Sequence, residues 1–373
     1  MGKGFHFDKD DLDFMKDVME HSDGSERKIG DFVIRNDYGA NLYYEGNGGD
    51  VIIPEEVGSA GRSFTFKSER ANNIRSLEYP SCIECIWADE IVPMRNSLEK
   101  IVFHEGLGRI LGAGAFANFM KLKDVKLPKS LCYLGSNAFK NTPWYKEHVE
   151  IVDGCHYIER FLVSSDKDIV NANVREGTVM ICGHAFRDRE SLLSVELPDT
   201  VRTLGEQAFC GCRKLKKISL PSSVEVIENS CFTGCVSMEF FEALNPNIEV
   251  APSILGSKTS DYIYYPKYAY IPTTIEDDAF QKDSVKKLIF AYCYLTSRER
   301  YSPEKQAIND KIVKKMKSKL LELIIEQKNE IALTNIVSLV IKGNGFNNLI
   351  KLEEEKGNAA GVEFLKKWKD KES

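Results

Sequence analysis

The sequence predicts a β-rich repeat solenoid of about eight coils, followed by an all-helical C-terminal region. An apolar pattern returns about every 23 residues between roughly residues 50 and 282, which is the signature of a repeat architecture. From about residue 284 a helical apolar period replaces that pattern. The length of 373 residues exceeds the size at which one compact core usually keeps growing, so we expect either two or more domains or a repeat array.

The repeat is clearest in two stretches, Leu192–Phe209 and Leu215–Phe232, which share the pattern LxxΦxLPxxVxxΦxxx[AC]F with Φ apolar. Their final phenylalanines are 23 residues apart, and a third clean copy runs over Leu122–Phe139. Weaker copies begin at residues 74, 98, 169 and 238. The one long interval, from 122 to 169, spans about two periods, so we expect a degenerate coil there. That coil would be built on Val149, Ile151, Cys155, Ile158 and Val163.

Each copy contains one short segment with alternating apolar residues, such as Val195–Leu197, which indicates a strand with one buried face. The proline that follows ends the strand because it lacks an N–H donor. The small Ala or Cys before each Phe suits a tight interior. One such coil cannot bury its own apolar face, so we expect stability to depend on stacked neighbours and on caps at the ends.

The two ends of the chain lie outside the repeat frame. We expect a leader over residues 1–30, with a short helix at Asp11–His21 as one interpretation, and a β-rich cap over 31–66. The solenoid then covers 67–283 and the helical domain 284–373. The strand-like segments of the N-terminal part are Phe32–Ile34, Leu42–Tyr44 and Val51–Ile53.

The helical domain has a recognisable first signal at Ser302-Pro303, a capping hydroxyl followed by proline at the first helical position. An apolar stripe follows it, and further helices are expected at about 329–342, 345–356 and 358–369. The domain either caps the solenoid or offers a second interaction surface. The stripe consists of Ile308, Ile312, Met316, Leu320, Leu323 and Ile324.

The pattern resembles the BspA-type (treponemal) leucine-rich repeat family of bacteria, whose hallmark is LxxIxLPxSVxxIGxxAFxGC. Leu215–Phe232 carries it, closed by Thr233-Gly234-Cys235, and Phe209-Cys210-Gly211-Cys212 repeats the ending. The resemblance covers roughly residues 50–282 and implies a leucine-rich repeat solenoid. It also implies a binding role, because members are mostly binding proteins or uncharacterised. Many members carry a signal peptide and a wall anchor, and we find neither motif here.

Composition points to a cytoplasmic protein. Hydrophobic residues make up 43%, charged residues 28%, and the net charge is −6, so neither nucleic acid nor a membrane is expected as a partner. The start of the chain lacks the apolar run of a signal peptide, and no stretch approaches a membrane span. The ten cysteines are spread along the chain and sit among apolar repeat positions, which favours reduced thiols.

Candidate chemistry is sparse, so we expect no catalytic residue, cofactor or metal, and no enzyme. Cys82-Ile83-Glu84-Cys85 is a CxxC, but a zinc or redox site needs further context, and Ile83 takes an inward repeat position. Cys212 and Cys235 share one repeat position and should stack as a buried ladder. Cys182 and His184 are close in sequence, but no acidic partner is apparent.

Five lysines, which we call the lysine patch, concentrate positive charge near the start of the helical domain. Nucleic-acid binding is conceivable there. A solvated face of one helix, balanced by Glu322 and Glu326, is the favoured interpretation. The patch consists of Lys311, Lys314, Lys315, Lys317 and Lys319.

The predicted functional surface is the concave strand face, where residues between the inward ones vary while the core frame repeats. We expect a non-enzymatic scaffold that binds another protein there, with the oligomeric state open. The alternatives are a cell-surface or host-interaction adhesin exported by an unrecognised route, and an enzyme with activity in the helical tail. One column is Glu78, Val102, Lys126, Asn173, Glu196, Ser219 and Glu242; the other is Ser76, Lys100, Asp124, Asn171, Ser194, Lys217 and Phe240. Both signs of charge occur in the columns, so no ligand charge is predicted.

Overall fold

The computed structural model describes residues 26–36, 40–60, 65–67, 71–88, 91–245, 248–250, 268–270 and 284–372. The short helix considered at Asp11–His21 lies outside these residues. The chain divides into two units. The first holds residues 1–166, 177–185 and 203–208, and the second holds 167–176, 186–202 and 209–373.

The first unit begins with a small sheet made of β1 (Glu26–Ile29), β2 (Phe32–Asn36), β3 (Ala40–Tyr44) and β5 (Thr65–Lys67). Strands β1, β2 and β3 are antiparallel, and β5 pairs in parallel with β3. Phe32, Ile34 and Leu42 are buried beneath this sheet. Strand β1 lies within the stretch expected as a leader.

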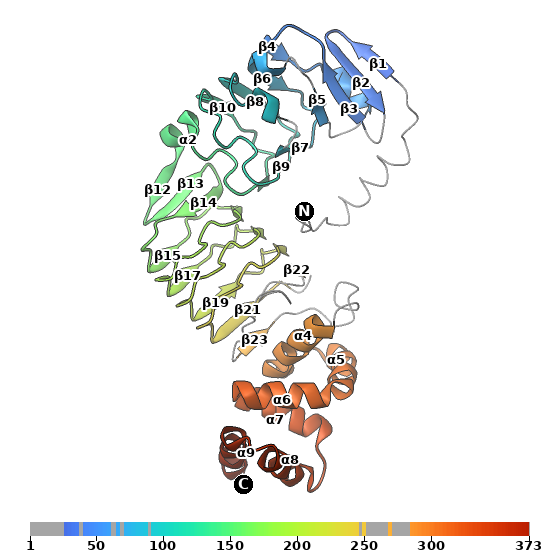
Figure 1. Ribbon diagram of the computed structural model, residues 1–373, viewed down its shortest axis with the longest axis vertical. Helices are drawn as coiled ribbons and strands as arrows, with labels where there is room; N and C mark the ends of the chain where they lie inside the picture. The colour runs from blue at the N-terminus through green and yellow to red at the C-terminus, as the bar shows by residue number, and fades with distance from the viewer. Residues whose placement is uncertain are drawn as a thin grey trace. The chain divides into compact units, whose positions relative to one another are not determined.

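The solenoid of the first unit consists of parallel strands that repeat coil by coil (Figure 1). Strands β4 (Gly49–Ile52), β6 (Ile74–Tyr79), β8 (Lys100–Phe103) and β10 (Asp124–Lys126) form one sheet. Strands β7 (Cys85–Trp87), β9 (Arg109–Leu111) and β11 (Tyr133–Leu134) form a second. Leu77, Ile101 and Val125 stand in register and are buried, which confirms the predicted inward alternation.

The carboxylate of Glu105 joins two successive coils. It accepts a hydrogen bond from the amide of Lys129 at 2.9 Å and another from the amide of Ser130 at 2.9 Å. These backbone donors lower the pKa of Glu105, because they stabilise its charged form. The Glu105 side chain thus satisfies two backbone amides of the next coil that form no hydrogen bond within a strand.

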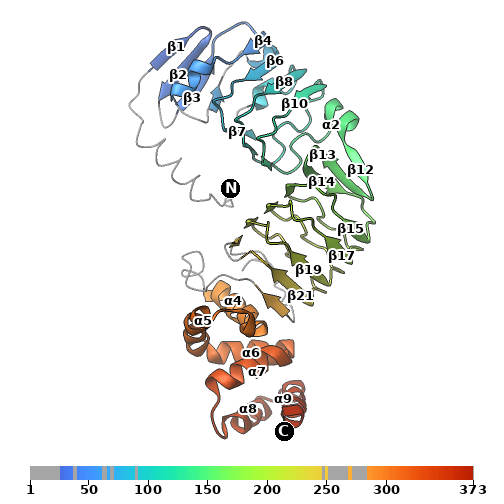
Figure 2. The same cartoon turned by 180° about the vertical axis from the view of Figure 1, so that it is seen from behind.

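The prediction that a degenerate coil fills the interval between residues 122 and 169 is wrong, because no regular coil stands there. Helix α2 (Pro143–His148) and an antiparallel set of β12 (Glu150–Val152), β13 (Cys155–Ile158) and β14 (Phe161–Ser165) stand in its place (Figure 2). Cys155 and Ile158 are buried, but Ile151 is 60% exposed. The reason is Asp153-Gly154, with φ of 48° and 77°, a two-residue turn of the kind that closes β-hairpins.

Beyond the hairpin the parallel frame resumes. Strand β14 pairs with β16 (Met180–Ile181), which pairs with β18 (Thr203–Leu204). In the second unit β15 (Asn171–Asn173), β17 (Ser194–Glu196), β19 (Lys217–Leu220), β21 (Phe240–Ala243) and β23 (Tyr268–Tyr270) form one parallel sheet. Strand β20 (Val226–Ile227) pairs with β22 (Glu249–Val250). The predicted β-rich solenoid is therefore confirmed.

The conserved ending of each repeat has a physical role in stacking. Phe209 lies between Phe186 at 5.1 Å and Phe232 at 5.2 Å, with nearly parallel rings. The thiols of Cys212 and Cys235 are buried, as expected, and each donates to a phenylalanine carbonyl 26 residues earlier, at 3.0 and 3.2 Å. The glycine between Phe and Cys, such as Gly234 with φ of 79°, supplies the left-handed turn that places the thiol.

The helical region, predicted as all-α, contains α4 (Ser284–Thr296), η5 (Arg298–Arg300), α5 (Pro303–Lys315), α6 (Lys317–Gln327), α7 (Glu330–Val340), α8 (Gly345–Glu355) and α9 (Ala359–Glu372). The hydroxyl of Ser302 caps α5 as expected. The stripe expected on one helix is divided, because α5 ends at Lys315 and Met316 is its C-cap, with an amide that donates to the carbonyls of both Ile312 and Val313. The apolar period continues across this break, so periodicity could not reveal it.

Candidate functional site

The outward residues of the first unit lie on the β10-β8-β6-β4 sheet. Glu78 stands beside Val102, which stands beside Lys126, and Lys100 lies between Ser76 and Asp124. These side chains are half-buried or exposed, while the apolar residues that alternate with them along each strand are buried. The two columns predicted from the sequence therefore exist as registered rows on this sheet.

The second unit has the same arrangement on a sheet of its own. Two separate sheets carry the predicted residues, because the β12–β14 hairpin and α2 interrupt the frame. In the second unit, Asn173 stands beside Glu196 and Ser219 beside Glu242. The other row of this sheet consists of Asn171, Ser194, Lys217 and Phe240.

On the first sheet, two pairs of polar side chains contact each other across coils. The ammonium of Lys100 is 3.1 Å from the Asp124 carboxylate, and Nε2 of His104 is 2.7 Å from Oε1 of Glu78. Exposed pairs of this kind contribute about 0–1 kcal/mol each to stability. A ligand on this face would compete with these existing contacts.

On the second sheet, three polar side chains are left open. The hydroxyl of Ser194 donates to Oδ1 of Asn171 at 2.7 Å. Within the described part of the chain, the side chains of Asn173, Glu196 and Lys217 are exposed and make no hydrogen bond or ion pair. An unpaired acid, base and amide on adjacent strands form a surface that an incoming partner can satisfy.

Two apolar side chains border the same rows. Val170 is 43% exposed and Leu193 is 40% exposed, and each directly precedes a strand of this sheet. The amide of Leu193 donates to the carbonyl of Val170 at 2.7 Å, so the two residues occupy equivalent places in successive coils. Sequence reasoning missed them because they stand at unassigned positions of the repeat frame, and only residues within the strands were considered for the surface.

The helical region occupies the far end of this sheet. Nη1 of Arg300 donates to Oε1 of Glu242 at 2.6 Å, and the hydroxyl of Ser219 donates to Oε2 of the same carboxylate at 3.3 Å. The side chain of Glu242 is only 13% exposed as a result. Of the predicted column, Glu242 is thus already bound within the chain, and the open face covers β15, β17 and β19.

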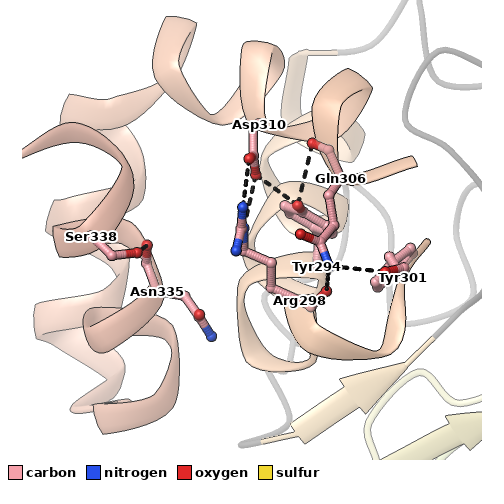
Figure 3. Close-up of polar contacts among 7 residues, drawn as sticks. All are labelled: Tyr294, Arg298, Tyr301, Gln306, Asp310, Asn335 and Ser338. Carbon is pink, nitrogen blue, oxygen red and sulfur yellow. Dashed lines mark hydrogen bonds and ion pairs between the residues drawn. The ribbon is translucent and has the colours of Figure 1, made fainter. Parts of the chain in front are cut away.

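A partly buried polar network holds the η5 turn that carries Arg300 (Figure 3). The guanidinium of Arg298 donates to both carboxylate oxygens of Asp310, at 3.0 and 2.7 Å, and the Tyr294 hydroxyl donates to Asp310 at 2.6 Å. The Gln306 amide donates to the carbonyls of Arg298 and Tyr301. Each of these donors is directed at a group of the same network, which indicates a structural tie among α4, η5 and α5.

The same contacts set the ionisation of the network. Burial raises the pKa of Tyr294, and its hydrogen bond to Asp310 raises it further. Burial also acts to raise the pKa of Asp310, but hydrogen bonds from Arg298 and Tyr294 outweigh it and lower that pKa overall. On the neighbouring helix α7, the Asn335 amide donates to the Leu295 carbonyl at 2.8 Å, and the Ser338 hydroxyl donates to the Asn335 carbonyl (Figure 3).

The cysteine and histidine candidates occupy structural positions. The Cys82 thiol donates to the Glu55 carbonyl at 3.5 Å, and Ile83 is buried as expected. Cys182 is buried, and His184 occupies a left-handed turn with φ of 66°. Over the described ranges no group of three metal-ligating side chains comes together. Nor does any helix in those ranges have the length and apolar character needed to cross a membrane.

A sequence model described as a BspA type leucine rich repeat region matches this chain in six copies, over residues 88–192 and 156–288. Together these ranges run from 88 to 288, which is more than half of the 373 residues. A search of curated proteins finds no match.

Several solved bacterial structures are also similar. The pneumococcal vaccine antigen PcpA is 18% identical, with 69% of this chain and 89% of that chain covered and a TM-score of 0.30. A leucine-rich repeat protein from Eubacterium ventriosum ATCC 27560 is 14% identical, with 69% and 82% covered and a TM-score of 0.32. One from Bacteroides ovatus ATCC 8483 is 23% identical, with 61% and 53% covered and a TM-score of 0.26. Because these TM-scores are low, the assignment of the fold depends on the strand register described above and not on these structures.

Proposed function

The chain belongs to the BspA-type leucine-rich repeat family, and we propose that it is a non-enzymatic scaffold that binds another protein through the outward face of β15, β17 and β19. Leucine-rich repeat proteins generally bind other proteins, and their solenoids are typically non-enzymatic. The observation that carries the proposal is the open set of Asn173, Glu196 and Lys217. Their polar groups are exposed and unpaired within the described residues, whereas on the other sheet Lys100 contacts Asp124 and Glu78 contacts His104, which leaves Lys126 as the open charge of the columns there.

The chemistry of this face defines the kind of partner that would bind it. Glu196 and Lys217 lie on adjacent strands but in different rows, so they are diagonal neighbours rather than a pair. Adjacent strands are about 4.8 Å apart, so a partner must present a base to Glu196 and an acid to Lys217 at a spacing that fits these neighbouring strands. Val170 and Leu193 add apolar area beside them, and interfaces usually combine such an apolar part with polar contacts.

The same face would serve a cytoplasmic scaffold or a surface adhesin. The predicted cytoplasmic location and the adhesin alternative differ in where the protein is found, and fractionation of the source cells distinguishes them. A binding role also stays a prediction for the residues of the columns on the first sheet, which are Glu78, Val102, Lys126 and Asp124.

The test is affinity capture from soluble and membrane fractions with three full-length baits. The first bait is the unchanged protein, and the second carries Asn173→Ala, Glu196→Lys and Lys217→Glu. The third is a matched control with Lys100→Ala and Asp124→Ala on the first sheet, and circular dichroism checks that all three fold. We expect one partner to be retained by the first and third baits and lost by the second. Equal retention by all three, or loss only from the third, would refute the assignment of the face.

A further inference from the structure

The five residues of the lysine patch lie at the end of α5 and the start of α6. Lys311, Lys314 and Lys315 have the spacing that puts side chains on one face of α5. Lys317 and Lys319 follow in the first turn of α6, directly after the break at Met316. All five side chains are exposed. The helix expected to carry them is therefore two helices, which meet within the patch.

No acidic neighbour neutralises this patch. Across the described residues, none of the five lysines makes an ion pair within 4.0 Å. Asp310 is bound to Arg298 and Tyr294, although Lys314 lies near enough to help lower the pKa of that carboxyl. Glu322 and Glu326, the acids expected to balance the charge, make no ion pair with the patch: Glu322 lies 3.6 Å from Lys356, and Glu326 makes no ion pair with a described residue. Five unneutralised positive charges remain in a chain whose net charge is −6.

We propose that the lysine patch is a docking surface for an acidic protein segment rich in Asp or Glu. The argument is charge complementarity combined with the size of the surface. At physiological salt, screening limits the range over which exposed charges interact to about 8 Å. A short acidic segment on the patch would interact mainly with the lysines. An extended polyanion would also meet acidic residues of the chain, whose net charge is −6, including the exposed Glu304 of α5 and Glu322 of α6.

The composition of the patch favours this partner over the other polyanions. Binding of single-stranded nucleic acid usually combines basic residues with aromatic side chains on which bases stack. Residues 311–319 contain no aromatic residue and no arginine, and the nearby Tyr294 and Tyr301 are buried. Helices that lie on membranes insert an exposed apolar face. Here Val313 is buried, and Ile312 and Met316 are half-buried.

The proposal is independent of the sheet face, because it uses none of the residues of β15, β17 or β19. It is tested on the full chain by fluorescence anisotropy with a labelled ten-residue oligoglutamate peptide. One variant carries Lys314→Gln, Lys315→Gln, Lys317→Gln and Lys319→Gln. The matched control carries the same loss of charge at four exposed lysines elsewhere, as Lys121→Gln, Lys140→Gln, Lys146→Gln and Lys167→Gln. Thermal unfolding checks that both variants keep the fold.

We expect the patch variant to bind the peptide roughly tenfold more weakly, from several lost contacts of modest strength, and the control to stay within about twofold of the unchanged protein. The affinity of the unchanged protein should fall as salt is raised. Equal binding by all three proteins, equal weakening in both variants, or no binding of the peptide would overturn the proposal. So would tighter, patch-dependent binding of phosphatidylserine vesicles or a 20-nucleotide DNA, which would assign the patch to a membrane or a nucleic acid instead.

Discussion

Replacing Phe209 by Ala tests the stacking that holds successive coils together. The ring is completely buried between Phe186 and Phe232, with centroid distances of 5.1 and 5.2 Å. Truncating a buried Phe to Ala usually costs about 3–5 kcal/mol. Phe209→Leu retains most of the volume but loses two ring contacts, each of which contributes about 0.5–1.5 kcal/mol. We therefore expect a decrease of about 1–3 kcal/mol in the free energy of unfolding for the Leu variant and a larger decrease for Ala.

The assay is urea unfolding followed by far-ultraviolet circular dichroism, combined with hydrogen exchange resolved by peptide. Because each coil contacts mainly its neighbours, the faster exchange should concentrate in β17, β19 and β21. Val170→Ala is the control, since an exposed side chain should change stability by less than about 0.5 kcal/mol. A cost below about 1 kcal/mol for Phe209→Ala, or faster exchange spread evenly over the chain, would refute the stacking argument.

Three further predictions concern contacts between elements. Arg300→Ala should change stability by less than about 1 kcal/mol, because the pair is partly exposed. It should nevertheless speed hydrogen exchange in β21 around Glu242, and unchanged exchange there would contradict the docked position of η5. The lowered pKa of Glu105 means that its contribution is present above the ordinary glutamate pKa and is lost as pH falls through the folded-state value. Glu105→Gln should therefore flatten the decline of the melting temperature in acid, and an unchanged decline would count against the inter-coil bonds. Burial raises the pKa of the Cys235 thiol, so this thiol should stay unreactive toward a thiol reagent in the native protein, whereas the exposed Cys132 should react. Peptide mass spectrometry reads the modification, and early modification of Cys235 would disprove its packing.

The coil frame could be read from the sequence because each decision in it is local. Alternation places Leu77, Ile101 and Val125 inward, and the small residue before each Phe marks the tight interior. The Gly-Cys ending reflects a left-handed turn and a thiol that satisfies a carbonyl of the preceding coil. Such features depend on the backbone geometry of a few neighbouring residues, and repetition makes the signal stronger.

The interruption of the frame was also present in the sequence, but a competing signal concealed it. The apolar residues between 149 and 163 fit the repeat well enough to suggest a coil. Asp153-Gly154 favours a hairpin turn, and the local turn chemistry prevailed over the approximate periodicity. The predicted columns were consequently divided between two sheets.

By itself, the sequence determined the solenoid, its period, its inward residues and the change to helices. Only the tertiary structure decided which outward residues stay open to a partner. Arg300 reaches Glu242 across 58 residues of sequence, and Glu322 lies 3.6 Å from Lys356 of the loop after α8. Periodicity reports which side of a strand or helix a residue occupies. The pairing of polar groups far apart in the chain depends on how the elements pack, and no local pattern encodes that choice.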